Sequence, residues 1–214
     1  MDITQTIALT MGVAWASGIN LYAALFMLGW MGSSGNIELP PDLEILSNPM
    51  VMLAAGLMYC VEFFADKIPG VDTGWDAIHT FIRIPAGAIL AAAAVGDIGP
   101  GAELAAAITG GTLAGGSHLA KAGSRVMINT SPEPVSNWFT SVGEDVMVIA
   151  GLWTALYNPV LFLVLLVVFI LLLIWLLPKL WRAMKKVFAW LGRFTGNAKR
   201  EESLTKLSDM KPEE

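Results

Sequence analysis

The run of residues 159–177, PVLFLVLLVVFILLLIWLL, is the feature that most limits what this chain can fold into. A helix needs about 20 mostly apolar residues to cross the hydrocarbon of a bilayer, and this run contains no charge at all. The whole chain agrees with it, because only 14% of its residues are charged against about 25% in soluble domains. We therefore expect an all-α integral membrane protein whose main partner is the lipid bilayer. No nucleic-acid partner is expected.

Five further segments are apolar enough to be predicted as membrane helices. They cover residues 4–31, 49–67, 74–95, 102–129 and 146–157. The first is interrupted at Ser17-Gly18-Ile19-Asn20, and the last is short unless part of the polar segment 130–145 enters the membrane with it. Whether that segment is re-entrant or a surface loop stays open. The sequence thus predicts six transmembrane helices, some of them broken or re-entrant.

The basic residues beyond Pro178 predict the orientation. They are Lys179, Arg182, Lys185, Lys186, Arg193, Lys199 and Arg200. Such residues stay on the cytoplasmic side, and six crossings then place the N-terminus there too. Residues 179–195 alternate basic and apolar positions, which predicts an amphipathic interfacial helix, although a plain basic flank gives the same orientation. Residues 196–214 are polar and are expected to be a disordered cytoplasmic tail.

Two halves of the membrane domain, residues 1–178, resemble each other. Residues 16–24 align with 114–122, and residues 51–57 align with 146–152 in the same order. This order predicts a duplication, with repeat 1 at about 4–95 and repeat 2 at about 102–177. Because three crossings per repeat is an odd number, the second copy would be inverted. Inverted repeats with broken helices are typical of secondary transporters, which bind substrate at the repeat interface.

Two stripes of ionisable residues interrupt the apolar sequence, each at helical spacing. The first contains Asp72, Asp76, His79 and Arg83, and the second contains His118, Lys121 and Arg125. Charges inside a bilayer are costly, so both stripes should point into the bundle. We expect at least one carboxylate–base pair between the halves. An ion-pair network that only holds helices together explains the stripes as well as a water-accessible binding site does.

Further polar residues extend this candidate site. Glu62 and Asp66 lie one helical turn apart and could bind a cation or relay protons, or could simply mark an interfacial helix end. In the segment SPEPVSN at 131–137, Ser136 and Asn137 could cap a helix starting at Trp138 whose N-terminus binds an anion; a rigid surface turn is the alternative. The full predicted translocation site comprises Glu62, Asp66, Asp72, Asp76, His79, Arg83, His118, Lys121, Arg125, Asn129, Glu133, Asn137, Glu144 and Asp145.

The polar blocks resemble a known family. The blocks are ADKIPGVD at 65–72, Trp75-Asp76, His79-Thr80, Arg83, His118, Lys121, Arg125, Asn129, SPEP at 131–134, Ser136-Asn137 and Glu144-Asp145. They are similar to those of bacterial membrane proteins grouped as domain of unknown function 4126, over about residues 16–156. The resemblance implies an integral membrane protein of the bacterial cytoplasmic membrane and brings no reaction, substrate or cofactor with it.

These features predict a small transporter or permease for a polar, anionic or phosphate-bearing solute or lipid headgroup, with carboxylates that suit proton coupling. The alternative is a membrane scaffold or assembly factor held together by its ion pairs. No enzyme is expected, because no nucleophile and base stand out. No cofactor or metal is expected either, since the single cysteine and the two histidines form no ligand set. A homo-oligomer stays open.

Overall fold

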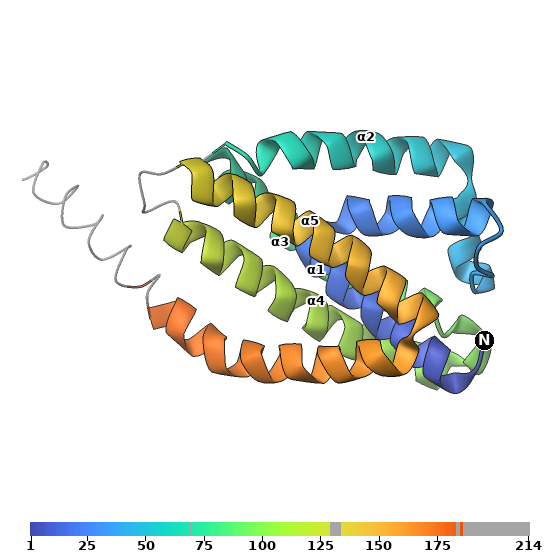
Figure 1. Ribbon diagram of the computed structural model, residues 1–214. Coiled ribbons are helices and arrows are strands. Elements are labelled where there is room, and N and C mark those ends of the chain that lie inside the picture. Colours follow the sequence, from blue (N-terminus) through green and yellow to red (C-terminus); the bar gives the residue numbers. More distant parts are fainter. Residues whose placement is uncertain (69, 129–133, 183–184, 186–214) are drawn as a thin grey trace, which may run out of the picture.

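The computed structural model describes residues 1–68, 70–128, 134–182 and 185, and every regular element among them is helical. Figure 1 shows the helices as one elongated bundle. The elements are α1 (Ile3–Ser33), η1 (Pro41–Ser47), α2 (Pro49–Ala65), α3 (Val71–Ala93), η2 (Gly96–Ile98), α4 (Pro100–Ile128), α5 (Pro134–Tyr157) and the C-terminal helix Pro159–Arg182. The predicted all-α class is confirmed.

Three helices are long and apolar enough to cross a membrane by length and composition: α1, most of α5, and the C-terminal helix. A fourth is added if η1 and α2, which are bent by 69°, form one broken span. The C-terminal helix is the most apolar and the least buried of the three, as the sequence predicts for a helix that faces lipid. The chain therefore has the helices of a membrane protein.

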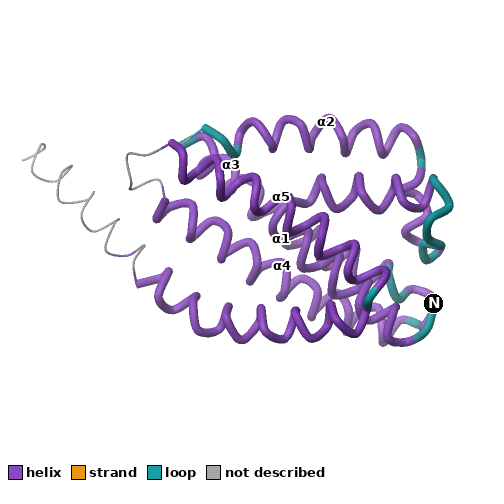
Figure 2. The backbone as a smooth tube through the Cα atoms, in the orientation of Figure 1, coloured by secondary structure: helices purple, strands orange, loops and turns teal. Residues whose placement is uncertain are grey.

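α1 folds back on itself instead of running straight. A straight helix of its 31 residues would put its ends about 45 Å apart. Instead, Ile3 and Thr6 line the same cavity as Pro40, and Gly32 at the other end of α1 lies against Leu39. Both ends of α1 are thus at one end of the bundle, and the two arms meet in its middle (Figures 1 and 2). α1 is a helical hairpin.

The turn of this hairpin lies at Asn20, whose φ of −145° and ψ of 93° are extended rather than helical. The interruption predicted at residues 17–20 is therefore confirmed. Its consequence was not predicted, because a single extended residue reverses the direction of the chain. A straight crossing by residues 4–31 is not what the structure contains.

The hairpin changes the expected topology. The N-terminal residue Ile3 lies near Ala105, in the first turns of α4, whereas Leu180 of the C-terminal helix lies against Gly123, near the other end of α4. The two ends of the described chain are thus at opposite ends of α4. The predicted six crossings, which place both termini on one side of the membrane, do not agree with this arrangement.

The inverted three-helix repeat is not confirmed. α1 reverses at Asn20, whereas α4, its expected counterpart, is one helix of 29 residues. α1 packs extensively on α2, but α4 barely touches α5. Only the later elements keep an inverted relation, since α2 and α5 run in opposite directions, as do α3 and the C-terminal helix (Figure 1).

Two predicted boundaries also differ. α5 already begins at Pro134, so Asn137 lies inside the helix and the prediction that it caps a helix starting at Trp138 is wrong. The short segment 146–157 is the second half of this 24-residue helix. The C-terminal helix continues through Pro178 to Arg182. The rest of the predicted amphipathic helix 179–195, except Lys185, and the tail 196–214 lie outside the described residues.

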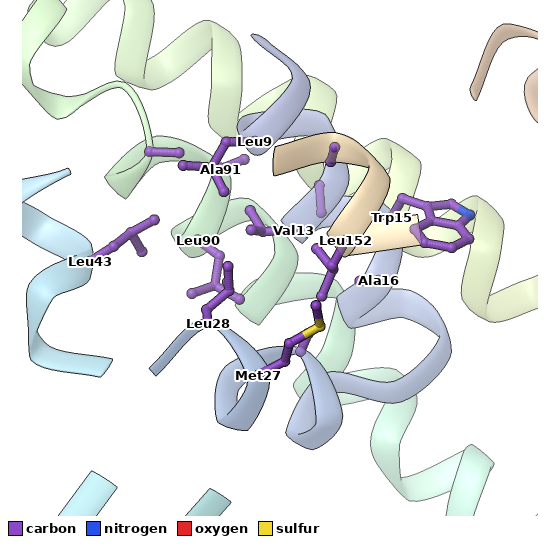
Figure 3. Packing of buried hydrophobic residues seen from close by; sticks show 14 of the residues in the cluster. Leu9, Val13, Trp15, Ala16, Met27, Leu28, Leu43, Leu90, Ala91 and Leu152 are labelled. Carbon is purple, nitrogen blue, oxygen red and sulfur yellow. The ribbon is translucent and has the colours of Figure 1, made fainter. Parts of the chain in front are cut away.

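An apolar core surrounds the arms of the α1 hairpin (Figure 3). It joins Leu9, Val13 and Leu28 of α1 to Leu43 of η1, Leu90 of α3 and Leu152 of α5. Small residues let the elements approach closely. A Cβ atom on Gly18 would fall within 2.3 Å of the Ala114 carbonyl oxygen. The tip of the hairpin is thereby held directly against α4, at the depth where the charged residues begin.

Candidate functional site

Eight ionisable side chains form one buried charge cluster at the end of the bundle where α2 meets α3. Its members are Glu62 of α2, Asp66 after it, Asp72, Asp76 and Arg83 of α3, Lys121 and Arg125 of α4, and Glu144 of α5. None of these side chains is more than 10% exposed. The expected inward orientation and the expected pairing between the two halves are both confirmed.

Arg83 binds two carboxylates from different helices. Its Nη2 lies 2.5 Å from Oε1 of Glu62, and its Nη1 lies 2.9 Å from Oδ1 of Asp76. Arg83 and Glu62 are fully buried, and Asp76 is nearly so. Charge-assisted hydrogen bonds of this kind are about twice as strong as neutral ones, so this triad fixes α2 to α3, which otherwise have few contacts.

Lys121 joins the cluster to the α1 hairpin. Its Nζ donates to Oδ2 of Asp66 at 2.7 Å and to the backbone carbonyl of Ile19 at 3.0 Å. Glu62 Oε1 lies farther away, at 3.4 Å. One ammonium group therefore binds both a carboxylate of the first half and the end of the first arm of α1.

Arg125 anchors the outer part of the cluster. It donates to Oε2 of Glu144 at 2.6 Å, to Oδ1 of Asn137 at 2.7 Å and to the backbone carbonyl of Asp66 at 2.7 Å. Oδ2 of Asp72 lies 3.7 Å away. The guanidinium thus connects α4, α5 and the turn after α2.

The break in α1 is closed by polar groups of neighbouring helices. Asn20 caps the second arm, since its Oδ1 accepts from the Ala23 amide at 2.9 Å, and its Nδ2 donates to Asp145 at 2.8 Å. At the end of the first arm Lys121 binds the open carbonyl of Ile19, and one turn earlier Ser117 donates to the Trp15 carbonyl. Irregular backbone at membrane depth is tolerated only where it is satisfied in this way or lines a cavity.

The two histidines have different hydrogen-bond partners. His79 Nδ1 lies 2.9 Å from the Trp75 carbonyl and donates to it, and its Nε2 lies 3.1 Å from the Tyr22 hydroxyl. His118 Nδ1 accepts from Arg83 at 3.2 Å, so its Nε2 donates to Thr80 Oγ1 at 2.7 Å. His118 therefore adds no positive charge to the cluster in this arrangement.

The cluster carries more negative than positive charge. With five carboxylates and three cations, its formal charge is −2. Within the part of the chain that the structure describes, one oxygen each of Glu62, Asp66 and Asp76 is buried without a hydrogen-bond partner. An uncompensated buried charge is strongly unfavourable. The cluster is thus suited to hold protons or another positive species.

Most predicted site residues meet in this region. His79, His118 and Asn137 contact its members or their neighbours, and Asp145 reaches Asn20. Asn129 and Glu133 lie outside the described residues. Three polar residues of the site, Asn20, Thr80 and Ser117, were not predicted. Asn20 belongs to the predicted helix interruption, which was the one signal that could have identified it.

Fold and site together define a helical membrane protein with a charged, closed interior next to a broken helix. A family model described as domain of unknown function (DUF4126) matches residues 7–179, and the chain belongs to this family. The resemblance inferred from the polar blocks is confirmed and extends into the C-terminal helix. No curated protein and no solved structure matched the chain.

Proposed function

We propose that this protein is a small secondary transporter of the cytoplasmic membrane, closed to both sides in this conformation, whose charge cluster exchanges protons as a polar solute is moved. The observation that carries the proposal is the contact between the cluster and the break in α1, made by Lys121 on the Ile19 carbonyl. Discontinuous helices whose broken ends meet charged side chains are a recurring binding architecture of such transporters.

The charge of the cluster changes the solute class that we favour. The basic residues of the sequence suggested an anionic or phosphate-bearing solute. All three cations of the cluster, however, are paired with carboxylates, and the sum is negative. Electrostatics therefore supports a neutral or cationic solute, with protons as the coupling species.

For the topology we propose five crossings, by α2, α3, α4, α5 and the C-terminal helix, with α1 entering as a re-entrant hairpin. The basic residues Lys179 and Arg182 support a cytoplasmic end of the C-terminal helix. The N-terminus then lies outside. In a Cys60→Ser background, cysteines at Asp2 and Glu38 should both react with a membrane-impermeant thiol reagent added outside intact cells. Labelling of either position only after lysis contradicts this topology.

A scaffold held together by ion pairs is the second candidate. It is favoured by the closure of the cluster, since Arg83 and Arg125 are fully buried and both are paired. Such a network can be structural alone, because charges in membrane helices pair whatever their role.

Proteoliposomes with a pH-sensitive dye in the lumen separate the two candidates. Lumenal pH is recorded while a neutral amino acid, a monovalent organic cation, a sugar or inorganic phosphate is added outside. A transporter produces a solute-dependent pH change for at least one of them, lost in Glu62→Gln and kept in Glu44→Gln, which alters an exposed carboxylate. No response above protein-free liposomes for any of the four supports the scaffold.

A further inference from the structure

We propose that Glu62 and Asp76, which both bind Arg83, share one proton, so that one of the two acids is neutral. This deepens the proposed function by naming the two carriers of the coupling proton, and in that respect it rests on it. The presence of the proton itself follows from charge and burial, and it can be tested without transport.

The geometry around Arg83 supports a proton on the Glu62–Asp76 pair. Each carboxylate uses one oxygen to accept from the guanidinium, Oε1 of Glu62 and Oδ1 of Asp76. The other oxygen of each, Oε2 and Oδ2, is buried and has no hydrogen-bond partner among the described residues. Both residues are at most 1% exposed. Burying a neutral carboxylic acid in such a place costs far less than burying an ionised carboxylate, so a proton on one of these oxygens lowers the cost.

The charges that face Glu62 and Asp76 leave one negative charge uncompensated. From α4, Lys121 lies 3.4 Å from Glu62 and 3.8 Å from Asp76, but its short contact is to Asp66. Arg83 and Lys121 thus face three acids, Glu62, Asp76 and Asp66, so one negative charge is left over.

The other titratable groups around the pair do not supply the missing positive charge. Tyr22 of α1 and His79 of α3 bind each other, and the second ring nitrogen of His79 binds the Trp75 carbonyl, so neither nitrogen is directed at the pair. His118 of α4 accepts from Arg83 and is neutral. Asp66 and Glu144, which form ion pairs with Lys121, are themselves acids and supply no positive charge. One proton on the Glu62–Asp76 pair balances Arg83.

A metal ion is a poorer match than a proton. Within the residues that the structure describes, no three His, Cys, Asp or Glu side chains are grouped so that they could hold a metal ion. A hard cation such as Ca²⁺ takes six to eight oxygen ligands. A proton needs one oxygen, and two unpartnered oxygens are present.

Infrared spectroscopy of the purified full-length protein in lipid nanodiscs tests this directly. At neutral pH the wild-type protein should show a carboxylic-acid C=O stretch that shifts in D₂O. Glu62→Gln and Asp76→Asn should each lose one carboxyl equivalent of this band, because each amide mimics the protonated acid and leaves its partner ionised. Glu44→Gln, an exposed control, should keep it.

The proposal is overturned if the wild-type protein has no such band, or if either folded variant keeps the band at its wild-type intensity. Each amide can still accept from Arg83, so both variants should fold, with thermal unfolding checked first; either variant alone suffices to decide. The infrared band tests the shared proton, and the liposome assay tests transport, so a negative result in one does not decide the other. A band without any solute response keeps the shared proton and removes the transporter, whereas a response without the band removes the proton from this pair.

Discussion

The apolar core and the charge cluster are buried to the same degree, yet they hold the molecule together by opposite means. Leu28 and Leu152 in the core, and Arg83 and Arg125 in the cluster, are all fully buried. In the core, stability depends on volume, because close-packed side chains feel the loss of even one methylene. In the cluster it depends on the balance of charge, because removing one partner leaves an uncompensated buried charge.

The α1 hairpin belongs to both regions. Its arms carry Leu9, Val13 and Leu28 into the core, while its tip at Ile19 and Asn20 is bound by Lys121 and Asp145. The core therefore fixes where the hairpin lies, and the cluster determines what its tip contacts. Substitutions in the two regions should accordingly differ in size and, above all, in which property they change.

The largest effect should come from Arg125→Ala. The substitution strands Glu144 and Asp66, and breaking a buried pair from one side costs about 3–5 kcal/mol. We expect the protein to fail to accumulate in the membrane, measured by immunoblot of membrane fractions and by thermal unfolding of whatever is recovered. Arg182→Ala, at an exposed position, should leave both unchanged. Equal effects of the two substitutions would show that the charge cluster does not stabilise the protein more than an exposed charge does.

Leu152→Ala should come next. Leu152 is fully buried in the core and packs close to Gly12. Leucine-to-alanine changes in cores cost about 2–5 kcal/mol, so thermal unfolding in detergent should occur at a clearly lower temperature. The protein that remains folded should keep the infrared band and any solute response of the wild type. A folded Leu152→Ala protein that lost the band would show that core and cluster are not separable.

Asn20→Ala should have a smaller effect that links the two regions. It removes the cap on Ala23 and the hydrogen bond to Asp145. Loss of an N-cap side chain costs about 0.5–2 kcal/mol, and the stranded Asp145 adds to this. Asn36→Ala, at an exposed position, is the matched control. Unfolding temperatures that fall equally in both variants would contradict a special role for the hairpin turn.

The charged stripes were predictable because helical spacing and the cost of a lipid-facing charge leave one orientation. Asp72, Asp76, His79 and Arg83 recur every three to four residues in an apolar segment, and the structure turns them inward together. Glu62 was predicted for the same reason, from its depth in an apolar run. Periodicity and burial cost are local properties, so one sequence is enough to derive them.

The path of α1 was not predictable from the same arguments. Whether Asn20 bends or reverses the chain depends on one pair of backbone angles and on partners about 100 residues away, Ser117 and Lys121, which bind carbonyls of the first arm. Apolar length could not separate a crossing from a hairpin, because both need the same composition. The expected inverted repeat and shared side for the termini depended on that crossing.

The role of the Arg83 triad in transport is tested most directly by exchanging its three members for apolar side chains of similar size. The variant combines Glu62→Met, Asp76→Leu and Arg83→Met, so no charge is left stranded, and a purely structural network tolerates such an exchange. It is reconstituted beside the wild type, and lumenal pH is followed after addition of whichever of the four solutes gives a wild-type response. We predict that the triple variant inserts and unfolds near the wild-type temperature. Its lumenal pH should change no more than that of protein-free liposomes. A folded triple variant that responds at the wild-type rate would contradict this prediction.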